Sequence, residues 1–329
     1  MNREELKNVL DENIKRINEL DIDSIESGVK NIHGILLTIV KSKDDKNSNK
    51  TTNYTTPVDT MNSDLFEISN SNSNSNSNSK KTSSNNFNKF DDFIFLQEDI
   101  SFNISNQFLK LLIRIENFEF PNDEDEKKVE IIIIQILQIL QGILLIHPNS
   151  RNIFKGKYNM TIMIKLLNPK SNMRPNFLMI IECVLMLVSL FIRNCENLRN
   201  FEELKGIELI CGLIKGEYEE DEGDEKDDDN NGSNNNNNNN NNNDEQENQL
   251  TWQNVRIKSL EFLFFYLIPE FSKHLSNEET IIGKEDGIIR RSMESKILIL
   301  KKYLNNEFVD GIVQEFVSDK PFGDSITMW

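Results

Sequence analysis

Two long apolar segments most restrict what this chain can fold into. They run from Glu130 to His147 and from Phe177 to Ile192. Each is slightly shorter than the about 20 apolar residues that a membrane-spanning helix needs. At about 100° per residue the polar positions of each segment also gather on one face. The first row holds Glu130, Gln135, Gln138 and Gln141 and continues back to Lys127, and the second holds Glu182 and Ser189 and continues to Arg193. A lipid-facing helix would not carry such a row, so we expect helices packed inside a protein and no membrane span.

Two other stretches have too few apolar residues to fold. Lys41 to Asn88 is rich in Ser, Asn, Lys and Thr, and Gly216 to Asn248 is first acidic and then almost pure asparagine. Burial cannot offset the entropy cost of ordering such backbone. We therefore expect a helical pair at 1–40, a disordered linker at 41–90 and helical repeats at 91–215. A disordered insertion at 216–250 and further repeats with a C-terminal tail at 251–329 complete the division.

Charge and composition exclude several classes of function. A net charge of −17 argues against a nucleic-acid surface, which needs clustered Lys and Arg. The charged N-terminus lacks the apolar core of a signal peptide. Cys183, Cys195 and Cys211 have no paired spacing, which is typical of buried, reduced thiols in the cytoplasm. The histidines lack partners at metal-ligand spacing, and the glycines form no phosphate loop. We expect no metal, no cofactor and no enzymatic activity.

Helical spacing begins near the N-terminus and later repeats. Apolar residues recur every three or four positions from Leu6 to Leu20 and from Ile25 to Ile39. A shift of 47 places Phe154 on Phe201 and aligns the apolar positions on both sides. Repeats of about 40–47 residues with two or three helices are typical of armadillo and HEAT proteins. The sequence therefore predicts an all-α, armadillo/HEAT-like helical solenoid with disordered low-complexity insertions and essentially no sheet.

The C-terminal part continues this pattern. A third unit is expected to start at Val255 and to stop at Pro269, and a last helix is expected from Ser292 to Leu304. Ser292 follows two arginines. It is therefore either a phosphorylation site of a basophilic kinase or the N-cap of the last helix beside two solvent-exposed arginines. We expect the N-cap.

Polar residues at the repeat junctions are the candidates for partner binding. Asn149 and Arg151 in the first unit align with Asn197 and Arg199 in the second, with one residue of slip. Their side chains could hydrogen-bond the backbone of a bound peptide or tie adjacent helices together, and the sequence leaves both roles open. The further candidates are Glu202, Glu203, Tyr266 and Glu270, although Tyr266 also suits a core position.

Four strings resemble one protein family. They are LLIHPNSRNIF (Leu144 to Phe154), ENLRNFEELKG (Glu196 to Gly206), KSLEFLFFYLIPE (Lys258 to Glu270) and KKYLNNEFVDGIVQEFVSDKPFG (Lys301 to Gly323). The chain resembles the cell division control protein 14 family of septation initiation network components. It does not resemble the phosphatase of the same name, because Cys195 lacks the preceding His and the glycines of a phosphate-binding thiolate loop.

The resemblance implies a non-catalytic adaptor. Such a protein would bind a germinal-centre-type protein kinase and help to place it at the spindle pole body or centrosome during cytokinesis. The alternative is a general armadillo-type scaffold unrelated to cytokinesis, such as a transport adaptor for basic peptides. Neither interpretation fixes the oligomeric state.

Overall fold

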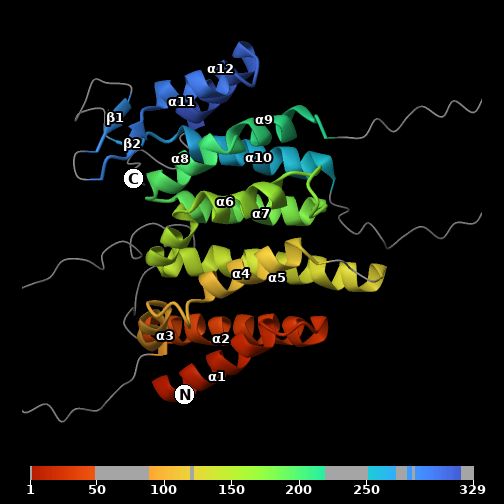
Figure 1. Ribbon diagram of the computed structural model, residues 1–329. Helices are drawn as coiled ribbons and strands as arrows, with labels where there is room; N and C mark the ends of the chain where they lie inside the picture. The colour runs from red at the N-terminus through yellow and green to blue at the C-terminus, as the bar shows by residue number, and fades with distance from the viewer. Residues whose placement is uncertain are drawn as a thin grey trace, which may run out of the picture.

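The computed structural model describes residues 2–48, 89–118, 122–218, 251–271, 280–283 and 286–319. The sequence predicts disorder for a linker at 41–90 and an insertion at 216–250. Residues 49–88 of the linker and residues 219–250 of the insertion lie outside the described part of the chain. Within them the chain is mostly helical, as the apolar spacing predicts. Figure 1 shows the helices stacked from α1 and α2 at one end to α11 and α12 at the other.

The N-terminal pair consists of α1 (Arg3–Ile17) and α2 (Ile22–Ser48). Asn2 and Glu5 form a capping box that satisfies two free backbone N–H groups at the start of α1. Most of the predicted apolar residues are buried, but Val9 on α1 is 36% exposed and Leu20 in the connecting turn is 76% exposed. Helix α2 continues to Ser48, so the expected end of this helical pair at residue 40 is eight residues too early.

Two successive three-helix units form the middle of the molecule. Each has a long apolar helix, a short helix at the junction and a third amphipathic helix, as the shift of 47 residues predicts. The first unit is α5 (Asp123–Ile146), η1 (Pro148–Lys155) and α6 (Lys157–Leu167), and the second is α7 (Phe177–Phe191), α8 (Cys195–Glu203) and α9 (Gly206–Lys215). Two helices precede them, α3 (Lys89–Gln97) and α4 (Ile104–Glu116). Asparagine N-caps start four of these helices: Asn103 for α4, Asn122 for α5, Asn176 for α7 and Asn194 for α8.

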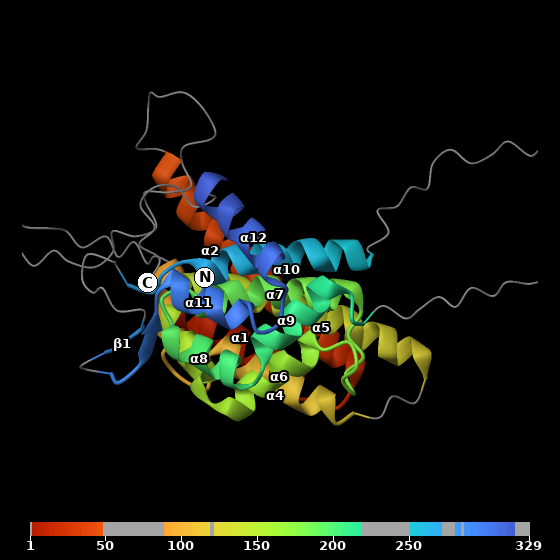
Figure 2. The ribbon, with the colours of Figure 1, turned by 90° about the horizontal axis from the view of Figure 1, so that it is seen from above.

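The longest helices pack on one another in series. Helix α2 contacts α5, α5 contacts α7, and α7 contacts α10 (Trp252–Leu267). The shorter helix α4 contacts α5, and α6 contacts α7. Figure 2, which looks along the stack, shows successive helices lying over one another. One continuous apolar cluster extends from Leu6 on α1 to Phe316 near the C-terminus. No layer could bury its apolar face without its neighbours.

The C-terminal part contains the only strands among the described residues, and they contradict the expectation of essentially no sheet. Strands β1 (Thr280–Ile282) and β2 (Ile289–Arg291) pair antiparallel, with Ile281 opposite Arg290. The expected last helix is shorter than predicted, because α11 runs only over Met293–Leu300. A further helix, α12 (Asn306–Asp319), packs through Val309, Ile312 and Phe316.

Helix α5 is long and apolar enough to cross a membrane by length and composition alone, and half of its apolar window is buried. Its polar row meets the polar row of α7, as Gln138 Nε2 donates to Glu182 Oε1 at 2.9 Å and Asn176 Nδ2 donates to Glu130 Oε2 at 3.2 Å. These contacts and the buried apolar face are consistent with a core helix.

Gly206 permits the sharp entry into α9. The preceding Lys205 has a left-handed backbone (φ 63°), and a Cβ on Gly206 would lie 2.3 Å from a ring carbon of Phe201. Since Phe201 is fully buried, its ring has no free space to move into. We expect Gly206→Ala to lower the free energy of unfolding by about 1–3 kcal/mol, measured by urea denaturation.

The matched control is Gly142→Ala. Gly142 lies inside α5 with no atom within 4 Å of the added Cβ. This change should leave stability unchanged or raise it by about 0.5–1 kcal/mol. Equal effects of the two substitutions would contradict the packing explanation.

Candidate functional site: a polar ladder at the helix junctions

Polar side chains at successive helix junctions bond to one another or to the backbone carbonyls of a neighbouring junction. We call this set the junction ladder. From the N-terminal to the C-terminal side its members are Glu98, Asn103, His147, Asn149, Ser150, Arg151, Asn197, Arg199, Glu202, Tyr266, Glu270, Arg291 and Lys296. Seven of the eight predicted partner-binding residues belong to it.

The first rung joins the end of α3 to the junction between α5 and η1. Asn149 Nδ2 donates to Glu98 Oε1 at 2.8 Å, and His147 Nε2 lies 3.0 Å from the same oxygen. Since a carboxylate only accepts, Nε2 carries the proton. His147 Nδ1 lies 2.8 Å from Ser150 Oγ, and Asn103 Nδ2 donates to the same Oγ at 3.0 Å.

The second rung joins η1 to the junction between α7 and α8. Arg151 Nη1 donates to the carbonyl of Ile192 at 2.6 Å, and Asn197 Nδ2 donates to the carbonyl of Arg151 at 2.8 Å. Both side chains are buried. Burial, with a smaller contribution from the charge of Arg193, lowers the pKa of Arg151 to about 10, so the guanidinium stays charged at neutral pH. This pair ties adjacent helices together, which is one of the two roles that the sequence left open.

The third rung is a buried charge cluster. Glu270 Oε1 accepts from Arg199 Nη2 at 2.6 Å and from Lys296 Nζ at 2.9 Å. Lys296 also donates to the carbonyl of Ile268 at 2.6 Å, and its side chain is 0% exposed. Burial lowers the pKa of Lys296 from its ordinary value, and the charge of Glu270 opposes that shift. The carboxylate of Glu270, in the segment after α10, therefore joins that segment to α8 and α11.

Glu202 extends this cluster to the hairpin. Its Oε1 accepts from Tyr266 Oη at 2.8 Å, and its Oε2 lies 3.2 Å from Arg291 Nε. The backbone N–H of Arg291 donates to Glu270 Oε2 at 3.1 Å. Tyr266 is fully buried, so the core position is observed, and burial raises the pKa of its hydroxyl. Both carboxylates therefore bond within the protein.

Two of the eight predicted residues remain exposed. Asn149 lies at the surface of the first rung. The side chain of Glu203 is 56% exposed and forms an ion pair with Lys157 at 2.5 Å, outside the ladder. The other six lie inside the fold, and partner binding through any of the eight stays a prediction.

Sequence reasoning missed Lys296, Arg291, Glu98 and His147. A signal was present for Lys296, because this lone cation shares a helix face with Leu300 and Leu304 in an apolar run. Such a cation on a buried face needs an anionic partner. Glu98 and Arg291 carried no comparable signal, since their partners are distant in the chain.

Ser292 is the N-cap of α11, as expected. Its Oγ accepts from the backbone N–H of Ser295, and the residue is buried. The two arginines before it are partly exposed, with 28% and 24% of their side-chain surface accessible, and each also pairs with a carboxylate, which the prediction did not include. Arg290 bonds Asp286, and Arg291 bonds Glu202.

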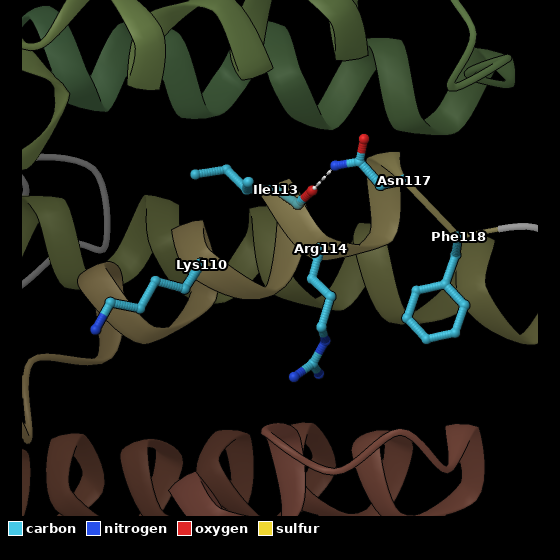
Figure 3. Close-up of a pocket in the computed structure, with 5 residues that line it drawn as sticks. All are labelled: Lys110, Ile113, Arg114, Asn117 and Phe118. Carbon is cyan, nitrogen blue, oxygen red and sulfur yellow. Dashed lines mark hydrogen bonds between the residues drawn. The ribbon is translucent and has the colours of Figure 1, made fainter.

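A second polar feature lies at α4, where Lys110, Ile113, Arg114, Asn117 and Phe118 line an open depression of about 560 Å³. Figure 3 shows Lys110, Arg114 and Phe118 pointing to the same side. Arg114 donates to the carbonyls of Ile17 and, at 3.0 Å, of Asn18. Burial lowers its pKa from the ordinary value. Arg114 therefore holds the C-terminal end of α1 against α4.

The geometry does not favour thiolate chemistry at Cys195. Burial raises the pKa of this thiol to about 12, and the neighbouring Glu270 carboxylate adds to the shift. The group stays protonated at neutral pH and is a poor nucleophile. Among the described residues, no group of three or more His, Cys, Asp or Glu side chains could hold a metal ion.

The protein therefore belongs to the class of layered helical proteins. Most of its polar side chains at the helix junctions form bonds that hold the layers together. The family model described as "Cell division control protein 14, SIN component" matches residues 6–322, where SIN denotes the septation initiation network. The chain belongs to this family. The match includes the N-terminal helices, which lie outside the four strings of the sequence resemblance.

A curated relative agrees with this assignment. The Schizosaccharomyces pombe protein named "Cell division control protein 14" is 24% identical over 234 residues, which cover 70% of this chain and 78% of that protein. No solved structure matches the chain.

The buried charge cluster predicts a large effect for Lys296→Met. This change leaves Glu270 buried with one fewer cation, which should lower the free energy of unfolding by about 3–5 kcal/mol in urea denaturation. The control Lys301→Met breaks the more exposed pair with Asp310 and should cost about 0–1 kcal/mol. Adding Glu270→Gln to Lys296→Met should recover part of the loss. Equal costs for Lys296→Met and Lys301→Met would contradict the cluster's role.

The ion pair between Asp286 and Arg290 in the hairpin predicts that Asp286 titrates at an unusually low pH. Hydrogen bonds from Arg290, and then from the backbone of Ile288, lower the pKa of Asp286 from 3.8 to about 2. A lowered folded-state pKa means that this contact stabilises the hairpin above the unfolded pKa and is lost as pH falls through about 2. Carboxyl ¹³C NMR should show Asp286 titrating near 2, and Arg290→Ala should return it toward 3.8. A midpoint near 4 in the unchanged protein would show that the contact is absent in solution.

Proposed function

We propose that this protein is a non-catalytic adaptor of a septation-initiation-type kinase cascade. In this role it binds a germinal-centre-type protein kinase in the cytoplasm and helps to localise it to the spindle pole body or centrosome for cytokinesis. The observation that carries the proposal is the family match over residues 6–322, because that family is described as a septation initiation network component. The name of the fission yeast relative supports it.

The non-catalytic part of the proposal is supported by how the polar residues are used. Glu202 and Glu270 accept hydrogen bonds within the fold, and Arg199 and Lys296 pair with them. A general acid or base must reach a substrate proton, and a saturated buried carboxylate does not. The high pKa of Cys195 supports the same view against a phosphatase-type thiolate.

The architecture supports a scaffold. The units α5–η1–α6 and α7–α8–α9 repeat the same order of long, short and amphipathic helix. We assign them to an armadillo/HEAT-like solenoid. Stacked repeats of this kind present an extended surface, which suits binding of another protein.

The binding surface should include the exposed candidates Asn149 and Glu203. Asn149 lies near the start of the short helix η1 in the first unit, and Glu203 ends the short helix α8 in the second. Both side chains are exposed, so a partner can contact them while the buried bonds of the junction ladder stay in place. A partner lying along this edge of the stack would contact both.

The test is affinity capture of the tagged full-length chain from dividing cells, with partners identified by mass spectrometry and location followed with a fluorescent tag. We expect a germinal-centre-type kinase and a signal at the spindle pole body. Changing Asn149 and Glu203 together to Ala should lower kinase recovery about three- to tenfold, as loss of about 1 kcal/mol predicts. Changing Gln314 and Glu315, exposed on α12, to Ala should not.

Two results would count against the proposal. Gentle lysis that recovers no kinase would refute the cascade role. Recovery of unrelated proteins and no kinase, without a signal at the spindle pole body, would favour the general scaffold instead.

A further inference from the structure

The first rung of the junction ladder opens into a surface notch of about 370 Å³. Its lining comes from the α3–α4 connection and from the junction between α5 and η1. The lining residues are Gln97, Glu98, Ile100, Asn103, His147, Asn149, Asn152 and Ile153. We call this feature the Glu98 notch. It contains one carboxylate and no lysine or arginine.

The carboxylate in the notch is held in place. Asn149 Nδ2 and His147 Nε2 both bond Oε1 of Glu98, at 2.8 and 3.0 Å. His147 is itself fixed through Ser150, which bonds Asn103. The hydrogen bonds from Asn149 and His147 also lower the pKa of Glu98, so the group is ionised at neutral pH. Two donors on one oxygen fix the rotamer of an otherwise mobile side chain.

The second oxygen of that carboxylate, Glu98 Oε2, is available to accept a hydrogen bond from a ligand. The Glu98 side chain is 55% exposed, and no hydrogen bond to its Oε2 occurs among the described residues. The carboxylates of the third rung differ, because Glu202 and Glu270 each receive bonds on both oxygens and lie inside the fold. Of these three ladder carboxylates, Glu98 is the one that faces solvent.

The neighbouring groups favour a particular cation. Asn149 Nδ2 is used on Glu98, so its carbonyl oxygen remains as a second acceptor in the same notch. Ile100, which is 61% exposed, offers an apolar surface beside them. A guanidinium is planar and can donate to two acceptors at once, and its methylene stem packs on apolar surface. An ammonium offers a point charge without this fork.

We propose that the Glu98 notch binds an arginine side chain of a partner protein. The guanidinium donates to Glu98 Oε2 and to the side-chain oxygen of Asn149, and the stem of the arginine lies on Ile100. The proposal does not depend on the partner being a kinase, because it names the side chain that the notch accepts. It can fail while kinase capture succeeds, and the reverse also holds.

The test measures weak binding of blocked tripeptides to the full-length chain by saturation-transfer NMR. The probe is acetyl-Gly-Arg-Gly-amide, compared with the same peptide carrying citrulline, a neutral analogue of arginine, or lysine. We expect the arginine peptide to bind at least about fivefold more tightly than the citrulline peptide, as an accessible ion pair predicts. The lysine peptide should bind more weakly than the arginine peptide.

The chain is strongly acidic, so a cationic peptide also collects on it without a specific site. Glu98→Gln and the control Glu315→Gln therefore remove the same charge, one in the notch and one on the exposed face of α12. Glu98→Gln should weaken the arginine peptide about fivefold, and Glu315→Gln should not. Equal affinities in the two variants, or equal binding of arginine and citrulline peptides, would overturn the site. Equal binding of lysine and arginine peptides would overturn the assignment to arginine.

Discussion

Helix ends leave backbone carbonyl groups without a partner inside their own helix, and the rest of this structure depends on how these groups are satisfied. Three cations from neighbouring helices supply the missing donors. Arg114 bonds the end of α1, Arg151 bonds Ile192 after α7, and Lys296 bonds Ile268 after α10. A positive charge at a helix C-terminus also interacts favourably with the helix dipole. Each bond joins one layer to another, so the same side chains that satisfy helix ends also set the positions of the layers.

Burial of the long apolar helices creates this requirement. Helix α7 is apolar on nearly every side and α5 is apolar opposite its polar row, and Ile136 and Leu187 are fully buried. Such helices are stabilised mainly by packing, and that packing also brings their ends into the interior. Asn197, in the short helix α8, also satisfies a backbone carbonyl at a junction, because its side chain donates to the carbonyl of Arg151 in the preceding unit. Apolar burial and polar junctions are two consequences of one stacking arrangement.

Local periodicity explains what the sequence could predict. The helices, the unit break at Pro148 and the asparagine caps follow from spacing and from residues within a few positions of each boundary. The hairpin did not follow, because three-residue strands are too short to show a period of two. The charge cluster did not follow either, since Arg199 and Glu270 are 71 residues apart and only the fold brings them together. Asn149 and Asn197 share one sequence pattern, yet only Asn149 faces solvent, because exposure depends on which neighbour covers the junction.

The ladder also decides which substitutions can report on binding. Replacing Arg199 and Glu202 together, which the sequence alone would suggest as a binding test, removes two members of a buried network that includes Tyr266 and Arg291. Loss of a partner in that variant would report on stability, because a buried charge without its partner is strongly destabilising. A mutational test of binding should therefore use side chains whose removal leaves the buried junctions intact. Among the polar candidates these are the outward-facing ones, and Glu98 differs from the others because the ladder fixes its position while one of its oxygens stays open to a partner.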